Sequence, residues 1–595
     1  KPNELQKDEP WVMLILQAKG DVFIALFKQH KSIKYLQYAL ESYELSIAQL
    51  DFLKEKFWFN KDKAKLTSNE YNSFEKAIEI VLLMANETDN EQEKQLLYEK
   101  ALAFAEKSKA SLLLESLKNF EAKQFANIPD SLLNEENELN IKRSALKSEQ
   151  KAITDANKKD SLKNKIFDLE REHEQLVKNI EINYPEYQQL KYKVQLANKN
   201  SLLRVIDENT ALIEYVVGDE NIFVFTLTKN DGLAVHSLKR TDELYEQLTE
   251  FRAIISNPND SYKRYVQLAQ QMYNDLLKPA LITPKTILEK LIVIPDDVLG
   301  YIPFDAMLIE EAKDSVPNYR QNHLDYLIEK YQISYAYSAT MLLKSAETIT
   351  KETAPNNYAG FAPNFKGTYE VQRGCANENL NELMCSKKGV NVINEMVNGK
   401  VFLDEKASKS NFIDKAKHFK VLHLATHACL SDDDPLYNKI YFANAEVLST
   451  YEVYNLNINA DLTVLSACNT GSGKLQRGEG IMSLSRAFMQ AGCPSILTSL
   501  WAVDDCATTE LMVLFYQNLY NGQAKQAALR TAKMTYLKQA SNAESMPFYW
   551  AGFVNIGNTK PVKFETKINY YQKYLMGAFV LIGLVLIGGL IKSKM

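Results

Sequence analysis

The sequence has few cysteines, and their spacing is not that of a metal centre. Of its 595 residues six are cysteine, namely Cys375, Cys385, Cys429, Cys468, Cys493 and Cys506. No two of them stand in the Cys-x-x-Cys spacing that is typical of zinc and thioredoxin-type sites. We therefore expect no metal site and no cofactor. Only Cys375 and Cys385 stand close together in loop-like sequence, so a disulfide between them is possible in an oxidising compartment.

The sequence also lacks a strong net charge. Its formal net charge is −5 and its isoelectric point is near 6.0. A nucleic-acid binder needs a basic surface that neutralises phosphates, and this composition does not provide one. We expect no nucleic-acid partner. The remaining composition is that of an ordinary globular protein, and the length predicts several domains.

A long uncharged run stands at the C-terminal end. No charged residue lies between Leu575 and Ile591, and a helix of this length spans about 26 Å. Side chains suited to the two membrane interfaces flank the run, namely Tyr570, Tyr571, Tyr574, Lys592 and Lys594. We therefore expect a transmembrane helix over 574–591, and a membrane protein with a single-pass C-terminal anchor.

The N-terminal part of the chain has a helical pattern. Over residues 11–117 apolar residues recur at spacings of three and four, and no proline interrupts them. Two stretches, 35–50 and 96–117, are similar to the second helices of tetratricopeptide repeats. We expect tetratricopeptide-like helical repeats over 1–120.

A highly charged region follows, in which leucine and isoleucine recur at intervals of seven. The residues are Leu132, Leu139, Leu146 and Ile153, then Leu162, Leu169 and Leu176. Two such runs predict a helical hairpin whose arms pack along an apolar seam. We expect a coiled-coil hairpin linker over 121–200.

After about residue 200 the pattern changes to short strands separated by amphipathic helices. The expected strands are 210–218, 221–229, 233–238, 291–297, 331–338, 357–363, 420–427, 462–468, 494–501 and 548–557. Apolar strands that do not alternate, between helices, predict a largely parallel sheet buried on both faces. Such sheets carry their chemistry beyond the carboxyl ends of the strands.

The expected fold class is therefore multidomain. All-α repeats and the helical hairpin come first, and an α/β domain with a mostly parallel sheet follows over 201–558. A juxtamembrane linker over 559–573 leads to the transmembrane helix, and a tail over 592–595 ends the chain.

Two of the expected strands end on residues that can form a catalytic dyad. "VLHLATH" ends at His427 and "TVLSAC" ends at Cys468. A thiol of ordinary pKa is only slightly ionised at neutral pH. A neighbouring imidazole can take its proton, and the resulting thiolate is a nucleophile that attacks acyl carbon atoms. His423 lies deeper in its apolar run and is expected to be a hydrogen-bonded core histidine. The residue types alone leave Cys468 as either a nucleophile or a small buried residue.

Five blocks of the sequence resemble a known family. They are "VIPDDVLGYIPFDAML", "VLHLATHACLSDDDPLYNKIYF", "LTVLSACNTGSGKLQRGEGIMSLSRAFMQAGCPSILTSLWAVDD", "LMVLFYQNLYNG" and "MPFYWAGFVNIG". These blocks are similar to those of the CHAT domain, a caspase-like domain of the cysteine-peptidase clan that also contains caspases, separase and gingipains. The resemblance covers about 205–558, and CHAT domains are frequently fused to tetratricopeptide repeats. It implies that His427 is the dyad histidine and Cys468 the nucleophile.

The resemblance also implies an oxyanion site. Backbone N–H groups of Cys468 and of Ala428, the residue after the histidine, would hold the oxyanion. The family usually has glycine there, so alanine adds strain if the turn needs a positive φ. The stretch 471–480 matches the flexible loop after the nucleophile, with Gly478 and Gly480 opening the next helix.

A substrate pocket is implied by "SLWAVDD". This stretch is similar to one in separase whose acidic residue receives a basic P1 side chain, and the matching residue here is Asp505. A carboxylate there would select Arg or Lys. Asp505 fits equally well as the N-cap of a helix that starts near Cys506.

These features predict a membrane-anchored, caspase-like cysteine endopeptidase that acts through an acyl-enzyme. The helical repeats are expected to recruit a protein substrate and a protein regulator. The alternative is a catalytically silent scaffold with the same fold, which binds partners without turning over peptide. Acyl transfer to an amine, rather than to water, would need the same dyad.

Overall fold

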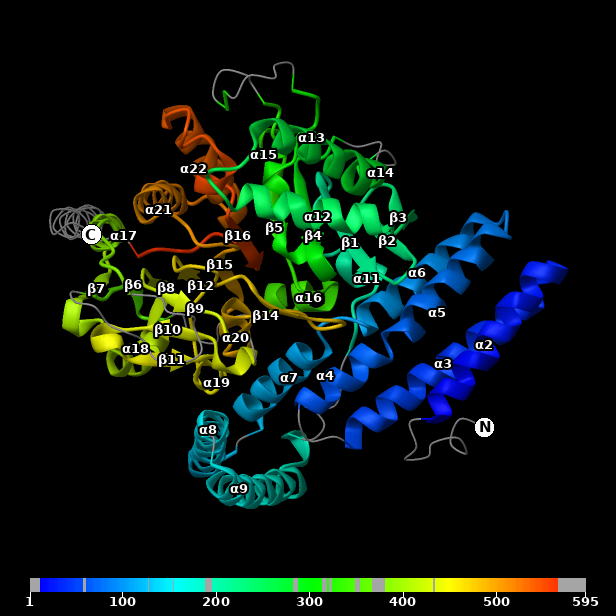
Figure 1. Cartoon of the computed structure of the whole chain (residues 1–595), viewed down its shortest axis with the longest axis horizontal. Helices are drawn as coiled ribbons and strands as arrows, with labels where there is room; N and C mark the ends of the chain where they lie inside the picture. Colours follow the sequence, from blue (N-terminus) through cyan, green and yellow to red (C-terminus); the bar gives the residue numbers. More distant parts are fainter. Residues whose placement is uncertain are drawn as a thin grey trace, which may run out of the picture.

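The computed structural model shows a helical N-terminal region followed by a large α/β domain (Figure 1). The described residues are 11–56, 60–126, 128–153, 155–187, 195–281, 287–312, 318–319, 324–347, 354–365, 380–431 and 434–565. This arrangement agrees with the expected order of an all-α region before an α/β domain with a mostly parallel sheet.

The helical region begins with a stack of antiparallel neighbours, drawn in blue in Figure 1. Its helices are α2 (Trp11–His30), α3 (Ile33–Lys56), α4 (Asn60–Asn69), α5 (Tyr71–Asn86), α6 (Glu91–Lys107) and α7 (Ser111–Phe125). Helix α2 packs on α3, α3 on α5 and α5 on α6. Ala39 and Ala101 are fully buried where these helices approach one another.

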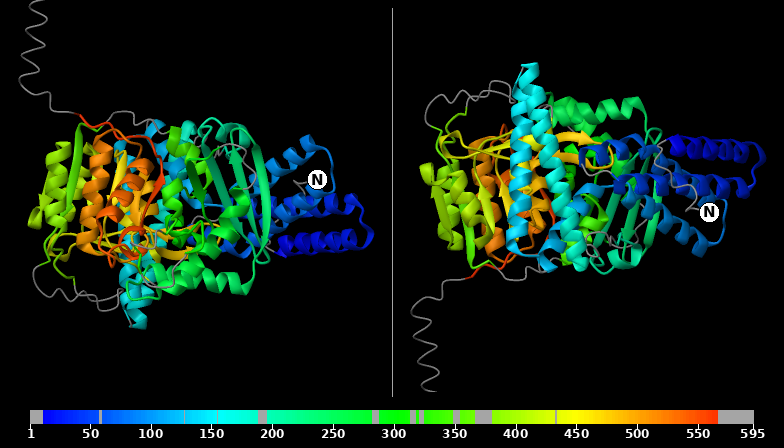
Figure 2. Two further views of the ribbon diagram at one scale, coloured as in Figure 1. Left: turned by 90° about the horizontal axis from the view of Figure 1, so that it is seen from above. Right: turned by 90° about the horizontal axis from the view of Figure 1, so that it is seen from below.

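A helical hairpin follows the stack. Its arms are α8 (Asp130–Ala152) and α9 (Ala156–Asn183), which pack against each other. Leu139, Leu176 and Ile180 are buried at the seam between the arms. In the view from below, the hairpin lies in front of the rest of the molecule (Figure 2).

The α/β domain is built on one sheet of eleven described strands. They are β1 (Thr210–Val217), β2 (Asn221–Thr228), β3 (Gly232–Lys239), β4 (Lys290–Ile294), β5 (Gln332–Tyr335), β6 (Asn356–Ala362), β7 (Lys400–Leu403), β8 (Phe419–Leu424), β12 (Leu462–Leu465), β15 (Ser495–Ser499) and β16 (Phe553–Gly557). Their order is β3-β2-β1-β4-β5-β16-β15-β12-β8-β6-β7. Strands β8, β12 and β15 are buried throughout, as expected for strands covered on both faces.

The sheet contains two blocks of parallel strands, which meet at the antiparallel pair β15–β16. Strands β15, β12, β8, β6 and β7 are mutually parallel. Strand β16 is antiparallel to β15, and β5, β4 and β1 follow its direction. The carboxyl ends of β6, β8, β12 and β15 therefore share one edge.

Helices cover both faces of the part of the sheet that contains β6, β8, β12 and β15. The helices of the α/β domain are α11 (Lys199–Leu202), α12 (Asp242–Ile255), α13 (Tyr262–Met272), α14 (Lys278–Leu281), α15 (Leu327–Lys330), α16 (Ala339–Glu347), α17 (Ser386–Val397), α18 (Lys409–Lys415), α19 (Thr450–Val453), α20 (Leu484–Gln490), α21 (Asp505–Tyr520), α22 (Lys525–Gln539) and α23 (Pro547–Trp550). In Figure 1, α17, α21 and α22 lie above the strands, and α18, α19 and α20 lie below them.

Two small sheets were not expected from the sequence. One consists of β9 (Ala428–Cys429), β10 (Lys439–Tyr441) and β11 (Val447–Ser449). The other is a hairpin of β13 (Gly473–Gln476) and β14 (Gly480–Ser483). The prediction of a flexible loop over 471–480 was therefore wrong, because residues from Gly473 on pair with β14, and helix α20 begins only at Leu484.

The predicted membrane location is contradicted. Among the residues that the structure describes, no helix is both long enough and apolar enough to cross a bilayer. Helix α2, for example, is 20 residues long but carries Lys19, Asp21 and Lys28. The range 574–591, which was expected to form the single-pass anchor, lies outside the described residues.

Candidate active site

The predicted dyad residues follow two neighbouring strands at the same edge of the sheet. Strands β8 and β12 pair in parallel, and Leu424 opposite Leu465 is their last pair. His427 and Cys468 each stand three residues beyond that pair. The parallel register therefore directs both chain segments past the same edge of the sheet.

Cys468 stands on a turn that β15 holds in place. The Ser499 hydroxyl donates to the Ala467 carbonyl at 2.6 Å, and the Gly471 N–H donates to the Ser499 carbonyl at 2.7 Å. Asn469 has a φ of 57°, in the left-handed region that asparagine enters more readily than most residues. Cys468 is not in a disulfide, and its side chain is partly exposed. The turn thus presents a thiol at the edge of the sheet.

His427 is held by a backbone carbonyl and an aromatic ring. Its Nε2 lies 2.7 Å from the carbonyl oxygen of Asn381, and its ring centroid lies 4.9 Å from that of Phe365. A carbonyl can only accept, so Nε2 donates the hydrogen bond. In the neutral ring Nδ1 then carries the lone pair, and this nitrogen is available as a base.

His423 is a core residue, as expected. It is 2 % exposed, its Nδ1 lies 3.1 Å from the Tyr358 hydroxyl, and its Nε2 lies 2.8 Å from the Ser466 hydroxyl. Its ring stacks on Tyr516 of α21 with the centroids 5.5 Å apart. Burial lowers the pKa of His423 to about 3, so the ring is neutral at physiological pH. The prediction that His423 is a hydrogen-bonded core histidine is confirmed.

The Ala428 N–H points away from its neighbouring strand. The Tyr441 N–H donates to the His427 carbonyl at 3.0 Å, and Ala428 opposite Ile440 is the next pair of the antiparallel ladder. Hydrogen-bonded and non-hydrogen-bonded pairs alternate in such ladders, so the Ala428 N–H is directed away from β10. Ala428 belongs to strand β9 and is not among the residues with positive φ. The strain expected for an alanine at this position therefore does not arise.

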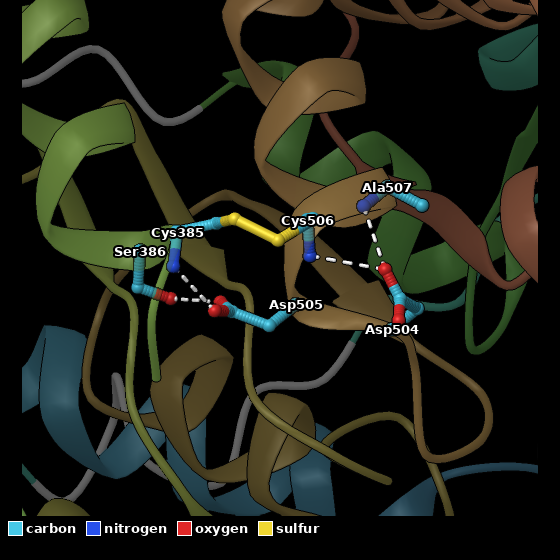
Figure 3. Close-up of a disulfide and its surroundings, with 6 residues drawn as sticks. All are labelled: Cys385, Ser386, Asp504, Asp505, Cys506 and Ala507. Atoms are coloured by element: carbon cyan, nitrogen blue, oxygen red, sulfur yellow. Dashed lines mark hydrogen bonds between the residues drawn. A yellow bond between two sulfur atoms is a disulfide. The ribbon is translucent and has the colours of Figure 1, made fainter. Parts of the chain in front are cut away.

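Asp505 lies at the start of helix α17 as well as at the start of α21. Its carboxylate accepts the Cys385 N–H at 2.7 Å and the Ser386 hydroxyl. The N-cap of α21 is Asp504, which accepts the N–H groups of Cys506 and Ala507 at 3.0 and 2.8 Å (Figure 3). Asp505 thus joins two helix starts, and its role as the floor of a P1 pocket stays a prediction.

A disulfide joins the same two helix starts. Cys385 pairs with Cys506, 121 residues later, with their Cα atoms 5.1 Å apart (Figure 3). The suggested pairing of Cys385 with Cys375 was therefore wrong. Helix α17 packs along α21, and this packing brings together two cysteines that are distant in the sequence.

The hairpin β13–β14, which follows Cys468, contacts the helical repeats. The Ala110 N–H donates to the Gly478 carbonyl at 2.8 Å. The carboxylate of Glu479 accepts the Ser111 hydroxyl at 2.8 Å and the Leu112 N–H at 3.0 Å, so it closes the first turn of α7. Glu479 also forms a buried ion pair with Arg486 of α20.

A cavity of about 60 Å³ lies at this junction between the repeats and the domain. Its lining includes Lys109 and Glu479, and also Asp296, Tyr337 and Leu500. It is therefore separate from the side chains of the candidate dyad, which are not in its lining.

Sequence reasoning missed the partners of the candidate histidine. Asn381 acts through its backbone carbonyl, and Phe365 lies 62 residues before His427 in the sequence. Neither position has a local sequence pattern that points to the site. The alternative that Asp505 is the N-cap was wrong by one residue, because α21 begins at Asp505 and Asp504 caps it.

A family model and curated proteins match parts of the chain. Residues 266–558 match the model of the CHAT domain. Tetratricopeptide repeat protein 28 from Homo sapiens is 36% identical over 112 residues, and the protein of the same name from Mus musculus is 34% identical over 112 residues. Each match covers 19% of this chain and 4% of the relative. The chain therefore spans only a small part of the length of these relatives.

Solved structures of one complex were also found. Two crystal structures of the Saccharomyces cerevisiae separase–securin complex, at 3.0 and 2.6 Å resolution, are each 10% identical with a TM-score of 0.36. Each alignment covers 92% of this chain and 47% of the solved chain. The chain spans about half the length of those chains.

Proposed function

The chain is a CHAT domain protein with helical repeats before that domain, and from this premise we propose that it is a cysteine endopeptidase. The observation that supports the proposal is the register of β8 and β12, in which His427 and Cys468 each follow the last pair of two neighbouring parallel strands by three residues. A thiol and an imidazole at adjoining strand ends are the parts of an acyl-transfer dyad.

The proposed reaction begins at the His427 ring. With Nε2 bonded to the Asn381 carbonyl, Nδ1 takes the proton of the Cys468 thiol, and the thiolate attacks the scissile carbonyl carbon. The imidazolium then gives its proton to the leaving amine. Water, deprotonated by the same ring, hydrolyses the acyl-enzyme and releases Cys468.

The oxyanion is proposed to bind to backbone N–H groups. The Ala428 N–H is directed away from β10, and the Cys468 N–H is the second donor. Such donors are fixed before charge develops, which is the source of their catalytic effect. An extended backbone at Ala428 supports this role, since the methyl group causes no strain there.

Protein partners are proposed to bind to the helical repeats. Helix α2 exposes apolar side chains on the face that does not pack on α3, namely Trp11, Leu14, Ile15 and Val22. Repeats of this kind use such faces for protein binding. A protein substrate or a protein regulator could therefore be recruited there.

Asp505 is proposed to favour Arg or Lys at P1. Both of its oxygens already accept hydrogen bonds from the start of α17, so a substrate cation would share the carboxylate with these donors. Fluorogenic peptides that differ only in Arg or Leu at P1 test this. Faster cleavage of the Leu peptide would disprove the assignment without affecting the dyad.

The dyad is tested with a peptidyl acyloxymethyl ketone probe that alkylates catalytic thiols. We expect labelling of the wild type, and its loss in Cys468→Ala and His427→Ala. Cys493→Ala is the matched control, because Cys493 is fully buried and burial raises its pKa to about 11; it should label like the wild type. Wild-type protein that stays unlabelled with its repeat-binding partners present would instead favour a scaffold.

A further inference from the structure

We propose that Cys385, Cys506 and Asp505 form a zinc site when the Cys385–Cys506 disulfide is reduced. One ligand atom from each of the three residues lies within 4.8 Å of the others. Two thiolates and a carboxylate are a donor set that zinc prefers. This inference does not depend on the proposed dyad, because none of the three residues belongs to it, although Asp505 is also the residue proposed to select the P1 side chain.

The distance between the Cα atoms of Cys385 and Cys506 suits both the disulfide and a pair of zinc-bound thiolates. The Cα atoms of the two cysteines are 5.1 Å apart. In a tetrahedral site with Zn–S bonds of about 2.3 Å, the two sulfur atoms stand about 3.8 Å apart. Side-chain rotation at two helix starts provides this separation, so the helices themselves need not move. Water would take the fourth position.

Charge favours the metal once the disulfide is open. Reduction places two thiols beside the Asp505 carboxylate, with Asp504 as the neighbouring residue (Figure 3). Both cysteines stand at helix starts, Cys385 as the N-cap of α17 and Cys506 in the first turn of α21. A divalent cation offsets the repulsion among the three anionic groups.

Asp505 has the supporting contacts that a metal ligand needs. Its oxygens accept from the Cys385 N–H and the Ser386 hydroxyl, and each carboxylate oxygen has a further lone pair. These hydrogen bonds fix the direction of the carboxylate in the way that outer contacts orient metal ligands.

The redox step is balanced by a dithiol reductant. A thiolate of the reductant attacks the sulfur of Cys506, which is the exposed member of the pair, and Cys385 leaves as a thiolate. The second thiol of the reductant then attacks the reductant sulfur of the mixed disulfide. This step releases Cys506 as a thiolate and converts the reductant into a cyclic disulfide. The chain gains two electrons and two protons, and zinc binding to the two sulfurs releases the two protons.

Zinc stoichiometry tests the proposal in a Cys468→Ala background, which removes the dyad thiol as a competing ligand. The full chain is reduced with a phosphine, because dithiols bind zinc themselves. It is then incubated with zinc and desalted, and its bound metal is measured by mass spectrometry. We expect about one zinc per reduced chain and none on the oxidised chain. Asp505→Asn should weaken binding at least about tenfold, and Cys385→Ser with Cys506→Ser should abolish it.

Cobalt provides a readout that does not depend on variants that could fail to fold. The reduced chain with Co²⁺ should show thiolate-to-cobalt charge-transfer absorption, which should disappear on reoxidation. Reduced protein that binds no zinc and shows no such absorption would overturn the proposal. Equal zinc binding by the double cysteine variant would overturn it as well.

Discussion

At the scale of the residue, the shape of the nucleophile turn depends on Asn469. This residue has a φ of 57° directly after Cys468, a conformation that costs about 1–2 kcal/mol for an ordinary L-residue and little for glycine. The hydrogen bond from the Asn469 N–H to the Trp501 carbonyl, 3.3 Å long, joins the turn to the segment that follows β15. The direction of the thiol is therefore set partly by its neighbour.

Asn469→Gly and Asn469→Val should behave differently. We expect the glycine variant to keep both its stability and the rate of Cys468 alkylation by iodoacetamide. The valine variant should lose about 1–2 kcal/mol of unfolding free energy and alkylate at a changed rate, because a β-branched residue resists positive φ. Denaturant titration and peptide mass spectrometry measure the two effects. Identical results for both variants would show that the turn tolerates any residue.

His423 should make the fold sensitive to acid. Its folded-state pKa is about 3 because it is buried, whereas an unfolded histidine titrates near 6.5. Between these values the unfolded chain binds a proton that the folded chain does not, so stability falls as the pH is lowered below 6.5. The contribution is present in full above pH 6.5.

His423→Gln should remove this dependence. From pH 6.5 to about pH 4 the wild type should lose roughly 1.4 kcal/mol per pH unit relative to the variant, measured by urea unfolding at each pH. His418→Gln, at an exposed histidine, is the matched control and should parallel the wild type. If the stability of His423→Gln fell with pH as steeply as that of the wild type, the assignment of a buried, neutral ring would be contradicted.

At the scale of the element, the hairpin β13–β14 is fixed by the repeats. Glu479 is 1 % exposed and is bonded both to the start of α7 and to Arg486, which is also 1 % exposed. The hairpin begins five residues after Cys468. A structural change at the start of α7 would therefore reach the turn that carries Cys468 through this hairpin.

Glu479→Ala should be strongly destabilising. It leaves Arg486 as a buried charge without its ionic partner, which costs about 3–5 kcal/mol. Hydrogen exchange should rise in β13, β14 and the first turn of α7. Glu246→Ala, at an exposed position of α12, is the control and should stay within about 0.5 kcal/mol of the wild type. A loss of similar size for both variants would contradict the buried pair.

Elements with a clear apolar pattern were predictable, and elements made by distant contacts were not. Nine of the ten strands expected from the sequence are present within a few residues, and the tenth, 548–557, is a strand only over Phe553–Gly557 because Pro547–Trp550 form helix α23. Runs of β-branched and aromatic residues between turn residues made these strands recognisable. Strand β7 (Lys400–Leu403) and the hairpin β13–β14 were missed. Both are short, and the hairpin gains its order from Ala110, Ser111 and Leu112, more than 350 residues earlier.

The same distinction, between features with a local sequence pattern and features formed by distant contacts, applies to the candidate site. His427 and Cys468 could be proposed from the sequence because each ends an apolar run, and the strands before them, β8 and β12, pair in parallel. The contacts of His427 with Asn381 and of Asp505 with Cys385 could not be found. They involve backbone groups, which every residue has, and they join segments that are distant in the sequence; the packing of α17 on α21 brings Cys385 to Asp505.

At the scale of the whole molecule, the repeats and the α/β domain share one core. Apolar residues of α5, such as Phe74 and Ile78, belong to the same buried cluster as Val216 of β1 and Phe223 of β2. The Tyr71 hydroxyl of α5 also donates to Asp296 at 2.8 Å. The two parts should therefore unfold together.

Tyr71→Phe tests this coupling. Removing the buried hydroxyl should cost about 1–2 kcal/mol, and hydrogen exchange should increase in β1 as well as in α5, because the two form one cooperative unit. Tyr38→Phe, at a tyrosine that is 48 % exposed, is the control and should change neither. An increase confined to α5 would show that the repeats open independently of the domain.

The disulfide has a further consequence for the covalent connectivity of the chain. Cys385 and Cys506 close a loop that contains both His427 and Cys468. A single backbone cut anywhere between these cysteines would give two fragments that remain linked through sulfur. On a gel run without reductant such a nicked chain would remain one species, and only reduction would separate its halves.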